Sequence, residues 1–452
     1  MGFRRYCYGL SFAMLPLLMV ACDGAGNSSR PSGHYEGMDK STALALIEAK
    51  PVVIPEYEET GSVIVSLELF EAYDRFDLAE AVLAAGVDLT VVVPAGFDGR
   101  LPGQQALDKA AGTRARIRLL EAEANVPVVW ARDWGPLAAR TATGDLTLLD
   151  FNYYNDRPDG DAVPSFMEPD GLPRISVPVY NEGGNFMINS RGDCVMTRRV
   201  VEANQDFEVP YQIDASGRFR STLDPELPLR RGTPYIDLQG QVRIRDRTEE
   251  HILSEADIID HYERFAGCRR TIMLDRMPGE GTGHVDMFAK FLDDDTVLMG
   301  AFTEEQLAGV KDSTEESMAR EMHAYLQTVR GQLEKAGFTI VTVPMPVPQK
   351  VVGSGGEISF MVRSYTNSLL LNKDGERSVL VPRYERKVTL IANRWIRRSD
   401  YSDDAALDGY EEAARRAYEK AGFRVTFITT DVLIAFAGSV HCVTMQVGRR
   451  SE

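Results

Sequence analysis

The chain has few of the residues on which disulfide-rich and metal-binding proteins depend. Its 452 residues include 5 cysteines and 6 histidines, and these form no C-x-x-C or H-x-x-x-H pair of the kind that binds zinc. No G-x-G-x-x-G follows a first strand and no Walker A lysine motif occurs, which argues against dinucleotide and P-loop sites. Basic residues are outnumbered, 50 against 67 acidic ones, for a net charge of −17. This balance disfavours nucleic acid as a partner and suits a cationic ligand.

Long apolar runs are also absent, apart from one short run near the N-terminus. This run, Leu10 to Val20, follows two arginines and is shorter than the ~20 residues that span a bilayer, so residues 1–21 predict an export signal. The ending Met19-Val20-Ala21-Cys22 resembles a bacterial lipobox, in which Cys22 carries lipid; an ordinary signal peptide is the alternative. Residues 22–48 predict a flexible tether. We therefore expect a lipid anchor in the bacterial cell envelope, in a membrane that the sequence does not specify.

The body of the chain contains an internal repeat. Glu334 to Val343 recurs as Glu419 to Ile428 and, more loosely, as Leu83 to Val93. In each copy an amphipathic helix precedes a glycine, and a β-branched run predicts a buried strand after it. Five such units of roughly 80 residues account for a single α/β domain over residues 49–452. The charged, Pro/Gly-rich stretch at about residues 206–250 is predicted to be an insertion.

The search for a nucleophile leads to the C-terminus. Cys194, Cys268 and Cys442 remain once the signal and lipid cysteines are set aside, and an odd number leaves at least one free thiol. The sequence does not tell whether Cys194 pairs with Cys268. Small residues precede Cys442, which favours a turn that presents its sulfur at a sheet edge; a buried structural cysteine is the alternative. His441 is adjacent, but neighbours on an extended chain point to opposite faces, so we do not expect it to be the base.

Four further candidates lie at predicted strand–turn junctions. Asp133 follows Trp130-Ala-Arg, Glu182 precedes two glycines, and His284 and Asp286 are spaced to share one face of a strand. A carboxylate beside glycines is most often a turn or cap residue. Together, however, the set offers a thiol, an imidazole and three carboxylates. Two carboxylates can grip a guanidinium fork, and a bound cation favours the reactive thiolate.

Four motifs occur in the same order as in a known group of enzymes. They are Ala131-Arg-Asp133-Trp-Gly-Pro136, Glu182-Gly-Gly-Asn185, Gly283-His284-Val-Asp286 and Val440-His-Cys442-Val-Thr444. With this set the chain resembles the agmatine deiminase and Porphyromonas-type peptidylarginine deiminase family, in the guanidine-modifying (pentein) superfamily, over about residues 50–450. The resemblance implies a five-bladed pseudo-symmetric α/β propeller of ββαβ units, which fits the repeat. It also implies that neither a metal nor a cofactor is needed.

The resemblance implies a role for each candidate residue. Cys442 would attack the guanidinium carbon and form a covalent thiouronium intermediate. His284 would protonate the departing ammonia and then activate water, and Glu182 would orient His284. Asp133 and Asp286 would hold the guanidinium nitrogens.

The substrate is less closely defined. Arg157 matches an arginine that binds a substrate carboxylate in the peptidylarginine deiminases, but a second such arginine is absent, and Asp159 stands nearby. Asn367, in Tyr365-Thr-Asn367-Ser, matches another active-site segment. We expect conversion of peptidylarginine or free arginine to citrulline and ammonia, with agmatine conversion to N-carbamoylputrescine as the alternative. Amidino transfer and non-catalytic binding of a cationic ligand also stay open, and the sequence gives no oligomeric state. A papain-like protease is disfavoured because its nucleophile lies near the mature N-terminus.

Overall fold

The computed structural model describes residues 50–122, 126–153, 158–167, 172–205, 253–352, 356, 358–384 and 406–449, together with four short strands between residues 205 and 253. All of these residues lie in one compact unit, Glu36–Glu452. The expected signal segment (1–21) and tether (22–48), and with them Cys22, lie outside the described residues. So do most residues of the expected insertion.

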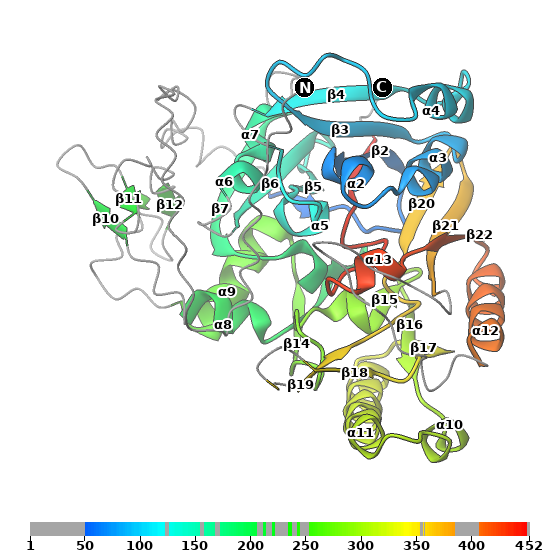
Figure 1. The fold of residues 1–452 in the computed structure, drawn as a ribbon. Coiled ribbons are helices and arrows are strands. Elements are labelled where there is room, and N and C mark those ends of the chain that lie inside the picture. The colour runs from blue at the N-terminus through cyan, green and yellow to red at the C-terminus, as the bar shows by residue number, and fades with distance from the viewer. Residues whose placement is uncertain are drawn as a thin grey trace. The chain divides into compact units, whose positions relative to one another are not determined.

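Five sheets in the described part of the chain share one pattern of pairing. In each of them a middle strand is antiparallel to one neighbour and parallel to the other. Figure 1 shows these sheets arranged around a common centre, as the blades of a five-bladed α/β propeller of the pentein type. The strand triplets are β23–β2–β3 (Met445–Gly448, Thr60–Ser66, Asp88–Pro94), β5–β6–β7 (Leu137–Arg140, Leu146–Asn152, Arg174–Tyr180), β8–β9–β14 (Met187–Ile188, Asp193–Thr197, Arg270–Leu274), β15–β16–β17 (Ala289–Phe291, Thr296–Ala301, Thr339–Pro344) and β20–β21–β22 (Leu369–Lys373, Glu376–Arg383, Arg424–Thr429).

Helices connect the middle strand of each blade to its parallel neighbour, because a parallel pair needs a crossover. In blade order these helices are α2 and α3 (Glu68–Glu71, Phe76–Ala84), α6 and α7 (Pro158–Asp161, Val163–Phe166), α8, α9 and the π-helical η3 (Arg199–Gln205, Glu255–His261, Tyr262–Ala266), α10 and α11 (Glu304–Ala308, Ser313–Lys335), and α12 (Leu407–Lys420). The repeated strand–helix–strand unit that the sequence predicts is therefore confirmed.

Additional elements decorate this frame. A short β1 (Val52–Val53) extends the β5 side of one sheet, and β4 (Ile117–Ala122), reached through α4 (Gln104–Ala111), extends the β3 side of another. Three hairpins stand apart from the five sheets. They are β10–β11 (Tyr211–Ile213, Phe219–Ser221), β12–β13 (Pro234–Ile236, Val242–Ile244) and β18–β19 (Gln349–Val352, Ile358–Met361).

Glycines end three of the crossover helices, as the repeat predicts. Gly86, Gly337 and Gly422 follow α3, α11 and α12 with φ of 80°, 101° and 87°. This left-handed conformation is one that glycine adopts without strain. Each glycine stands two residues before the next strand of its blade, so a single backbone turn redirects the chain from helix to strand in all three copies.

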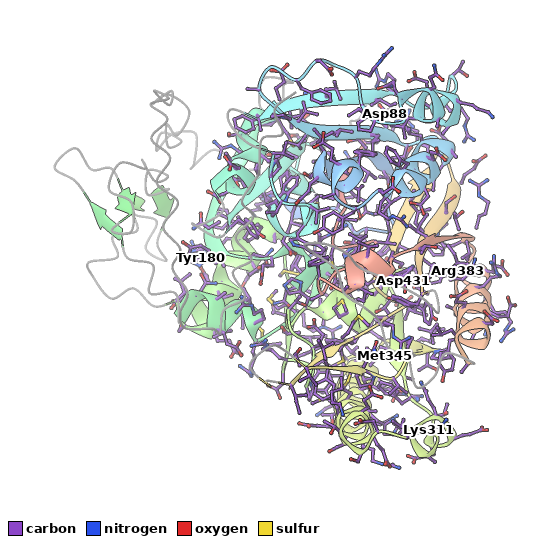
Figure 2. All side chains as sticks on the ribbon, viewed as in Figure 1. Asp88, Tyr180, Lys311, Met345, Arg383 and Asp431 are labelled. Carbon is purple, nitrogen blue, oxygen red and sulfur yellow. A yellow bond between two sulfur atoms is a disulfide. The ribbon has the colours of Figure 1, made fainter. Side chains whose placement is uncertain are left out.

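The ring of blades is closed by the two ends of the domain. The last strand, β23, pairs antiparallel with β2, which is the middle strand of the first blade. Shortly before it, α13 (Asp431–Ile434) is joined to the end of β21 by a hydrogen bond from the Thr430 N–H to the Arg383 carbonyl, 3.0 Å long. Figure 2 shows Arg383 and Asp431 side by side at this junction. The segment that follows α13 carries Cys442 back to the centre.

A disulfide crosses the third blade. Cys194 in β9 bonds to Cys268, which stands just before β14, with a Cα–Cα distance of 5.6 Å. This answers the question that the sequence left open, and it leaves Cys442 as the free thiol among the described cysteines. No helix among the described residues is long and apolar enough to cross a membrane.

Candidate active site

The candidate residues occupy equivalent places in the five blades. Each lies in the loop that leads into the strand that pairs antiparallel with the middle strand of a blade, within five residues of the start of that strand. We call this strand the first strand of the blade, whatever its place in the sequence. Asp133 lies in the helical turn α5 (Ala131–Trp134) before β5, Glu182 precedes the 3-10 turn η2 (Gly183–Asn185) before β8, His284 and Asp286 lie at η4 (Val285–Met287) before β15, Asn367 comes before β20, and Cys442 comes before β23. The pseudo-symmetry of the fold therefore brings residues from 133 to 442 to one place.

Two of the predicted local structures are wrong, although the residues still meet. Asp133 does not lie at a strand–turn junction, because the residues just before α5 form no strand and Asp133 itself lies in this helical turn. His284 and Asp286 do not share a face of a strand, because η4 turns the chain between them. The side chains converge through short helical turns at the strand entrances, and not through strand alternation.

The glycines beside Glu182 are needed for space and not for an unusual backbone angle. Neither Gly183 nor Gly184 has a positive φ. A Cβ atom on Gly183 would lie 2.2 Å from the Arg132 carbonyl oxygen. One on Gly184 would lie 2.6 Å from Nδ1 of His284, 3.0 Å from Oδ2 of Asp286 and 3.3 Å from Oδ1 of Asp133. Gly184 is thus the point around which these three side chains gather.

His284 stands between two carboxylates. It is 1% exposed, with Nε2 3.2 Å from Oε2 of Glu182 and Nδ1 3.9 Å from Oδ1 of Asp133. Among the described residues neither ring nitrogen has a hydrogen-bond partner. Its backbone N–H is fixed by Glu280, whose Oε2 accepts it at 3.2 Å.

Burial and neighbouring charges set the protonation of His284 and Asp133. Burial lowers the pKa of His284, but the charges of Glu182 and Asp133 outweigh it and raise this pKa to about 10. Burial, opposed by His284 and reinforced by Glu182 and Asp286, raises the pKa of Asp133 to about 7. At neutral pH His284 therefore holds a proton, and Asp133 is poised between its neutral and charged forms.

The thiol of Cys442 lies beside Asn367 and Asp286. The residue is 4% exposed, and Nδ2 of Asn367 donates to its sulfur at 3.2 Å, while Oδ2 of Asp286 lies 3.9 Å away. Burial, followed by the charges of Asp286 and Asp133, raises the pKa of Cys442 well above its usual value. Burial and these carboxylates therefore disfavour the thiolate, and a cation placed among them would reverse that effect.

Asp286 has one oxygen occupied and one free. Its Oδ2 lies 2.6 Å from Nδ1 of His441, whereas no group among the described residues hydrogen-bonds Oδ1, which is buried. The ring nitrogens of His441 face carboxylates and not the thiol of Cys442. Its Nε2 lies 2.7 Å from Oε1 of Glu56, so the imidazole bridges two carboxylates.

A cluster of buried charges continues from His441. Glu56 accepts from Arg132 Nη1 at 2.7 Å and from Lys290 Nζ at 2.8 Å. Burial raises the pKa of Glu56, but Arg132, His441 and Lys290 together hold it well below its usual value. We call Asp286, His441, Glu56, Arg132 and Lys290 the axial charge cluster. Sequence reasoning missed the role of this cluster. Glu56 lies in no recognisable motif, and the chemical roles were assigned to Asp133 and Cys442 and not to their neighbours Arg132 and His441.

A hollow lies beyond the axial charge cluster. It encloses about 720 Å³, including solvent. The first strands of four blades line it, through Ala138 of β5, Ile188 of β8, Phe291 of β15 and Val447 of β23, and so it marks the axis of the propeller. Asp286 and His441 also line it, whereas Cys442 and His284 do not. The axial charge cluster thus forms a wall between this hollow and the candidate site.

Glu182 has a second cationic neighbour. Nε of Arg199 lies 3.1 Å from the same Oε2 that faces His284, and both residues border a pocket of about 280 Å³ with Tyr180 and Asn181. Arg199 was not among the residues predicted from the sequence. Arg157, which was predicted to bind a substrate carboxylate, lies outside the described residues. Asp159 lies in α6 and is partly buried.

Three of these side chains could also accept a metal ion. One ligand atom each from Asp133, Glu182 and His284 lie within 4.8 Å of one another. The same atoms are equally suited to an organic cation, since a guanidinium offers several N–H donors to carboxylate oxygens. The arrangement can thus hold a planar cation against a thiol, with a protonated imidazole beside it.

Comparison with known proteins assigns the chain to a family. A family model described as Porphyromonas-type peptidyl-arginine deiminase matches residues 74–212 and 241–448, which is more than half of the chain. The chain belongs to this family. Membership places it among enzymes that deiminate guanidine groups, which are hydrolases of guanidino C–N bonds. The residues that the model leaves unmatched between the two stretches lie inside the predicted insertion, which itself stays a prediction.

Solved structures share the fold at low sequence identity. The agmatine deiminase of Enterococcus faecalis is 15% identical with a TM-score of 0.58, covering 94% of this chain and 100% of its own. The agmatine deiminase of C. jejuni is 17% identical with a TM-score of 0.57, covering 89% and 97%. A provisionally assigned arginine deiminase of Porphyromonas gingivalis is 19% identical with a TM-score of 0.58, covering 88% and 99%. No curated protein sequence matches the chain. The family model thus shows the class of reaction, and the solved structures show the fold.

Proposed function

We propose that this chain hydrolyses the guanidinium group of an arginine-type substrate, releasing ammonia and leaving a ureido product. The observation that carries the proposal is the setting of Cys442, a free buried thiol facing the carboxylate of Asp286. Asp133 and a proton-holding His284 gather with Asp286 around Gly184. A nucleophile, a proton donor and anchors for a cation are the groups that this reaction needs.

Substrate binding rests on the carboxylates. The free Oδ1 of Asp286 is buried, and a buried acceptor without a donor is costly. A guanidinium N–H supplies that donor, and Asp133 accepts from another nitrogen of the same fork. The bound cation offsets the negative charge that keeps the Cys442 thiol protonated, so binding promotes loss of its proton and forms the nucleophile.

The chemistry then proceeds in two halves. The thiolate of Cys442 adds to the guanidinium carbon, and the C–N bond breaks as His284 gives its proton to the leaving nitrogen, which departs as ammonia. A positively charged thiouronium remains on the sulfur. In the second half, neutral His284 takes a proton from water as its oxygen adds to that carbon. The C–S bond then breaks as the hydroxyl proton of the adduct passes to the departing sulfur, which releases the neutral ureido product and restores the Cys442 thiol.

Among possible substrates we place peptidylarginine or free arginine first and agmatine second. Two points support this order, namely the family to which the chain belongs and the match of Arg157 to a carboxylate-binding position. Export to the cell envelope, proposed from residues 1–22, also suits an extracellular peptide or amino acid.

The test measures ureido product formed by the full chain in detergent, with EDTA present. The substrates are agmatine, free arginine, and peptides with an internal or a C-terminal arginine. We expect Cys442→Ala to lose product formation and to keep its unfolding midpoint. Cys22→Ala is the matched cysteine variant: it should keep the activity while losing incorporated lipid, measured by mass spectrometry. Lipid-free wild-type protein would refute the anchor and leave the reaction untouched.

The pattern of substrates decides the finer question. Turnover of carboxylate-bearing arginine without turnover of agmatine supports Arg157 as a clamp. Turnover of agmatine alone makes the protein an exported agmatine deiminase. If none of these substrates yields product, deimination is refuted, and an added amine acceptor then tests amidino transfer.

A further inference from the structure

The imidazole of His441 is held between two acceptors. Nδ1 faces Oδ2 of Asp286 at 2.6 Å, and Nε2 faces Oε1 of Glu56 at 2.7 Å. A carboxylate accepts and does not donate, so both contacts are hydrogen bonds only when both ring nitrogens carry hydrogen, as in the imidazolium. The side chain is 2% exposed, which means that this positive charge acts at low screening.

Glu56 fixes the far end of this ion pair. Its Oε1 also accepts from Arg132, and its Oε2 accepts from Lys290, whose side chains are 2% and 4% exposed. Three cationic groups therefore hold one carboxylate, and its negative charge is secured at neutral pH. The backbone adds a further tie, because Oδ1 of Asn367 accepts the His441 N–H at 3.1 Å. His441 is thus held from both the ring and the main chain.

The consequence falls on Asp286. Three carboxylates, those of Asp133, Glu182 and Asp286, lie around one small space, and like charges brought together favour protonation of one of them. His441 places a cation against Oδ2 of Asp286, the oxygen that lies 3.9 Å from the sulfur of Cys442. The same contact occupies Oδ2 and leaves Oδ1 free.

We propose that His441 and Glu56 are positioning residues, which balance the negative charge beside Asp286 and hold its carboxylate by Oδ2, so that Oδ1 is left for the substrate guanidinium. This inference rests on the proposed function, since it assigns Asp286 to a cationic substrate. It adds a second layer of residues behind the loops that carry the candidate residues. This layer extends to the segment Pro55–Glu59 on the propeller axis. The charged groups that face His441 are Asp286, Glu56 and, through its Nε and the His441 carbonyl, Arg132; Lys290 acts through Glu56.

The test replaces the charge and keeps the hydrogen bond. His441→Gln retains an amide N–H that can donate to Asp286 but removes the positive charge. Without that charge the three carboxylates of the site together hold a proton up to a higher pH. We expect the acid limb of the kcat/KM profile for the arginine substrate to move up by at least one pH unit. At pH 6 we expect a loss of about tenfold or more, mainly in KM, and at pH 9 a value within threefold of wild type.

Matched variants separate charge from structure. Glu56→Gln should move the acid limb in the same direction, whereas Glu58→Gln, which removes an exposed carboxylate two residues away, should not. His323→Gln on α11 removes a partly exposed histidine that faces Glu304 and should also leave the profile unchanged. A loss of activity that is equal at every pH would make His441 a structural residue and overturn the proposal.

A second readout does not depend on turnover. Cys442 is alkylated with 2-chloroacetamidine, which is a cation, and with neutral 2-chloroacetamide, and labelling of its peptide is followed by mass spectrometry. In His441→Gln at pH 7, we expect the ratio of cationic to neutral rates to fall about tenfold. An unchanged ratio in folded protein refutes the role of His441. If wild type forms no ureido product, the proposed function fails by itself, and this ratio still tests the charge of the site.

Discussion

Gly184 offers the sharpest test of how tightly the site is assembled. Its Cα hydrogen points into the space shared by His284, Asp286 and Asp133, so Gly184→Ala adds one methyl group where the reacting groups converge. The new Cβ would lie 2.6 Å from Nδ1 of His284 and 3.0 Å from Oδ2 of Asp286. Ordinary van der Waals contact begins near 3.4 Å, so the imidazole has to retreat by about 0.8 Å.

His284 has little room for that movement. It is 1% exposed, its ring faces Glu182 on the other side, and its backbone N–H is tied to Glu280 at 3.2 Å. A displacement of about 1 Å in a reacting group can cost on the order of 100-fold in rate. That factor equals about 2.7 kcal/mol of transition-state stabilisation. We therefore expect kcat/KM of Gly184→Ala to fall at least 100-fold, with the larger part in kcat.

The assay compares this variant with Gly281→Ala. Gly281 lies in the loop just before His284, has no positive φ, and a Cβ there would meet nothing within 4 Å. Ureido product is measured for both variants, and thermal unfolding shows whether each is folded. Gly281→Ala should stay within about threefold of wild type, because it adds the same methyl group to open space.

Two results would contradict the reasoning. Gly184→Ala with kcat/KM within threefold of wild type would mean that His284 and the carboxylates are not held as the structure places them. An equal loss in Gly281→Ala would mean that the whole loop is sensitive, and the effect would then not be due to the contact with His284.

Three further predictions follow from other contacts in the structure. Burial, together with Glu182 and Asp286, raises the pKa of Asp133 to about 7, so arginine should bind Cys442→Ala more tightly as pH rises through about 7, and calorimetry should find this dependence lost when Asp133→Asn is added. Asn367→Ala removes a donor to the sulfur that is worth about 1.5–3 kcal/mol to a thiolate. It should therefore slow alkylation of Cys442 by a neutral reagent about tenfold or more, and equal rates would dismiss that hydrogen bond. Replacing both Cys194 and Cys268 by alanine opens a loop with a sequence separation of 74 and should lower the free energy of unfolding by about 4 kcal/mol. Urea is the denaturant for this measurement, because guanidinium is the expected ligand, and an unchanged midpoint would contradict the estimate.

The repeating unit could be predicted from sequence because it depends on local rules. A glycine with positive φ after a helix, followed by a β-branched run, has the same meaning at Gly86, Gly337 and Gly422. The strands that follow all pair parallel to the middle strand of their blade. What local rules could not supply is the closing pair, β23 with β2, since it joins residues almost 400 positions apart.

The candidate residues could be named for a different reason. Cys442, His284, Asp133, Asp286 and Glu182 stand out because their residue types are chemically reactive and their motifs are compact. The predicted local geometry around His284 was nevertheless wrong, because strand alternation was assumed where a 3-10 turn forms. The glycines after Glu182 predicted a turn, which forms as η2, but the close approach of Arg132 and His284 also requires them. Such contacts arise between blades, and no single segment of sequence encodes them.

His441 shows most clearly where sequence reasoning stops. Its neighbour Cys442 invites an interpretation as the base of a Cys–His pair, and the alternation argument removed it from that role without assigning another. The structure supplies the missing partners, Asp286 from the fourth blade and Glu56 from the segment that precedes the first. A histidine placed between two carboxylates has its hydrogen-bond partners set by the fold and not by its own motif. Its contribution to the site can therefore be recognised only after the fold has brought residues 56, 286 and 441 together.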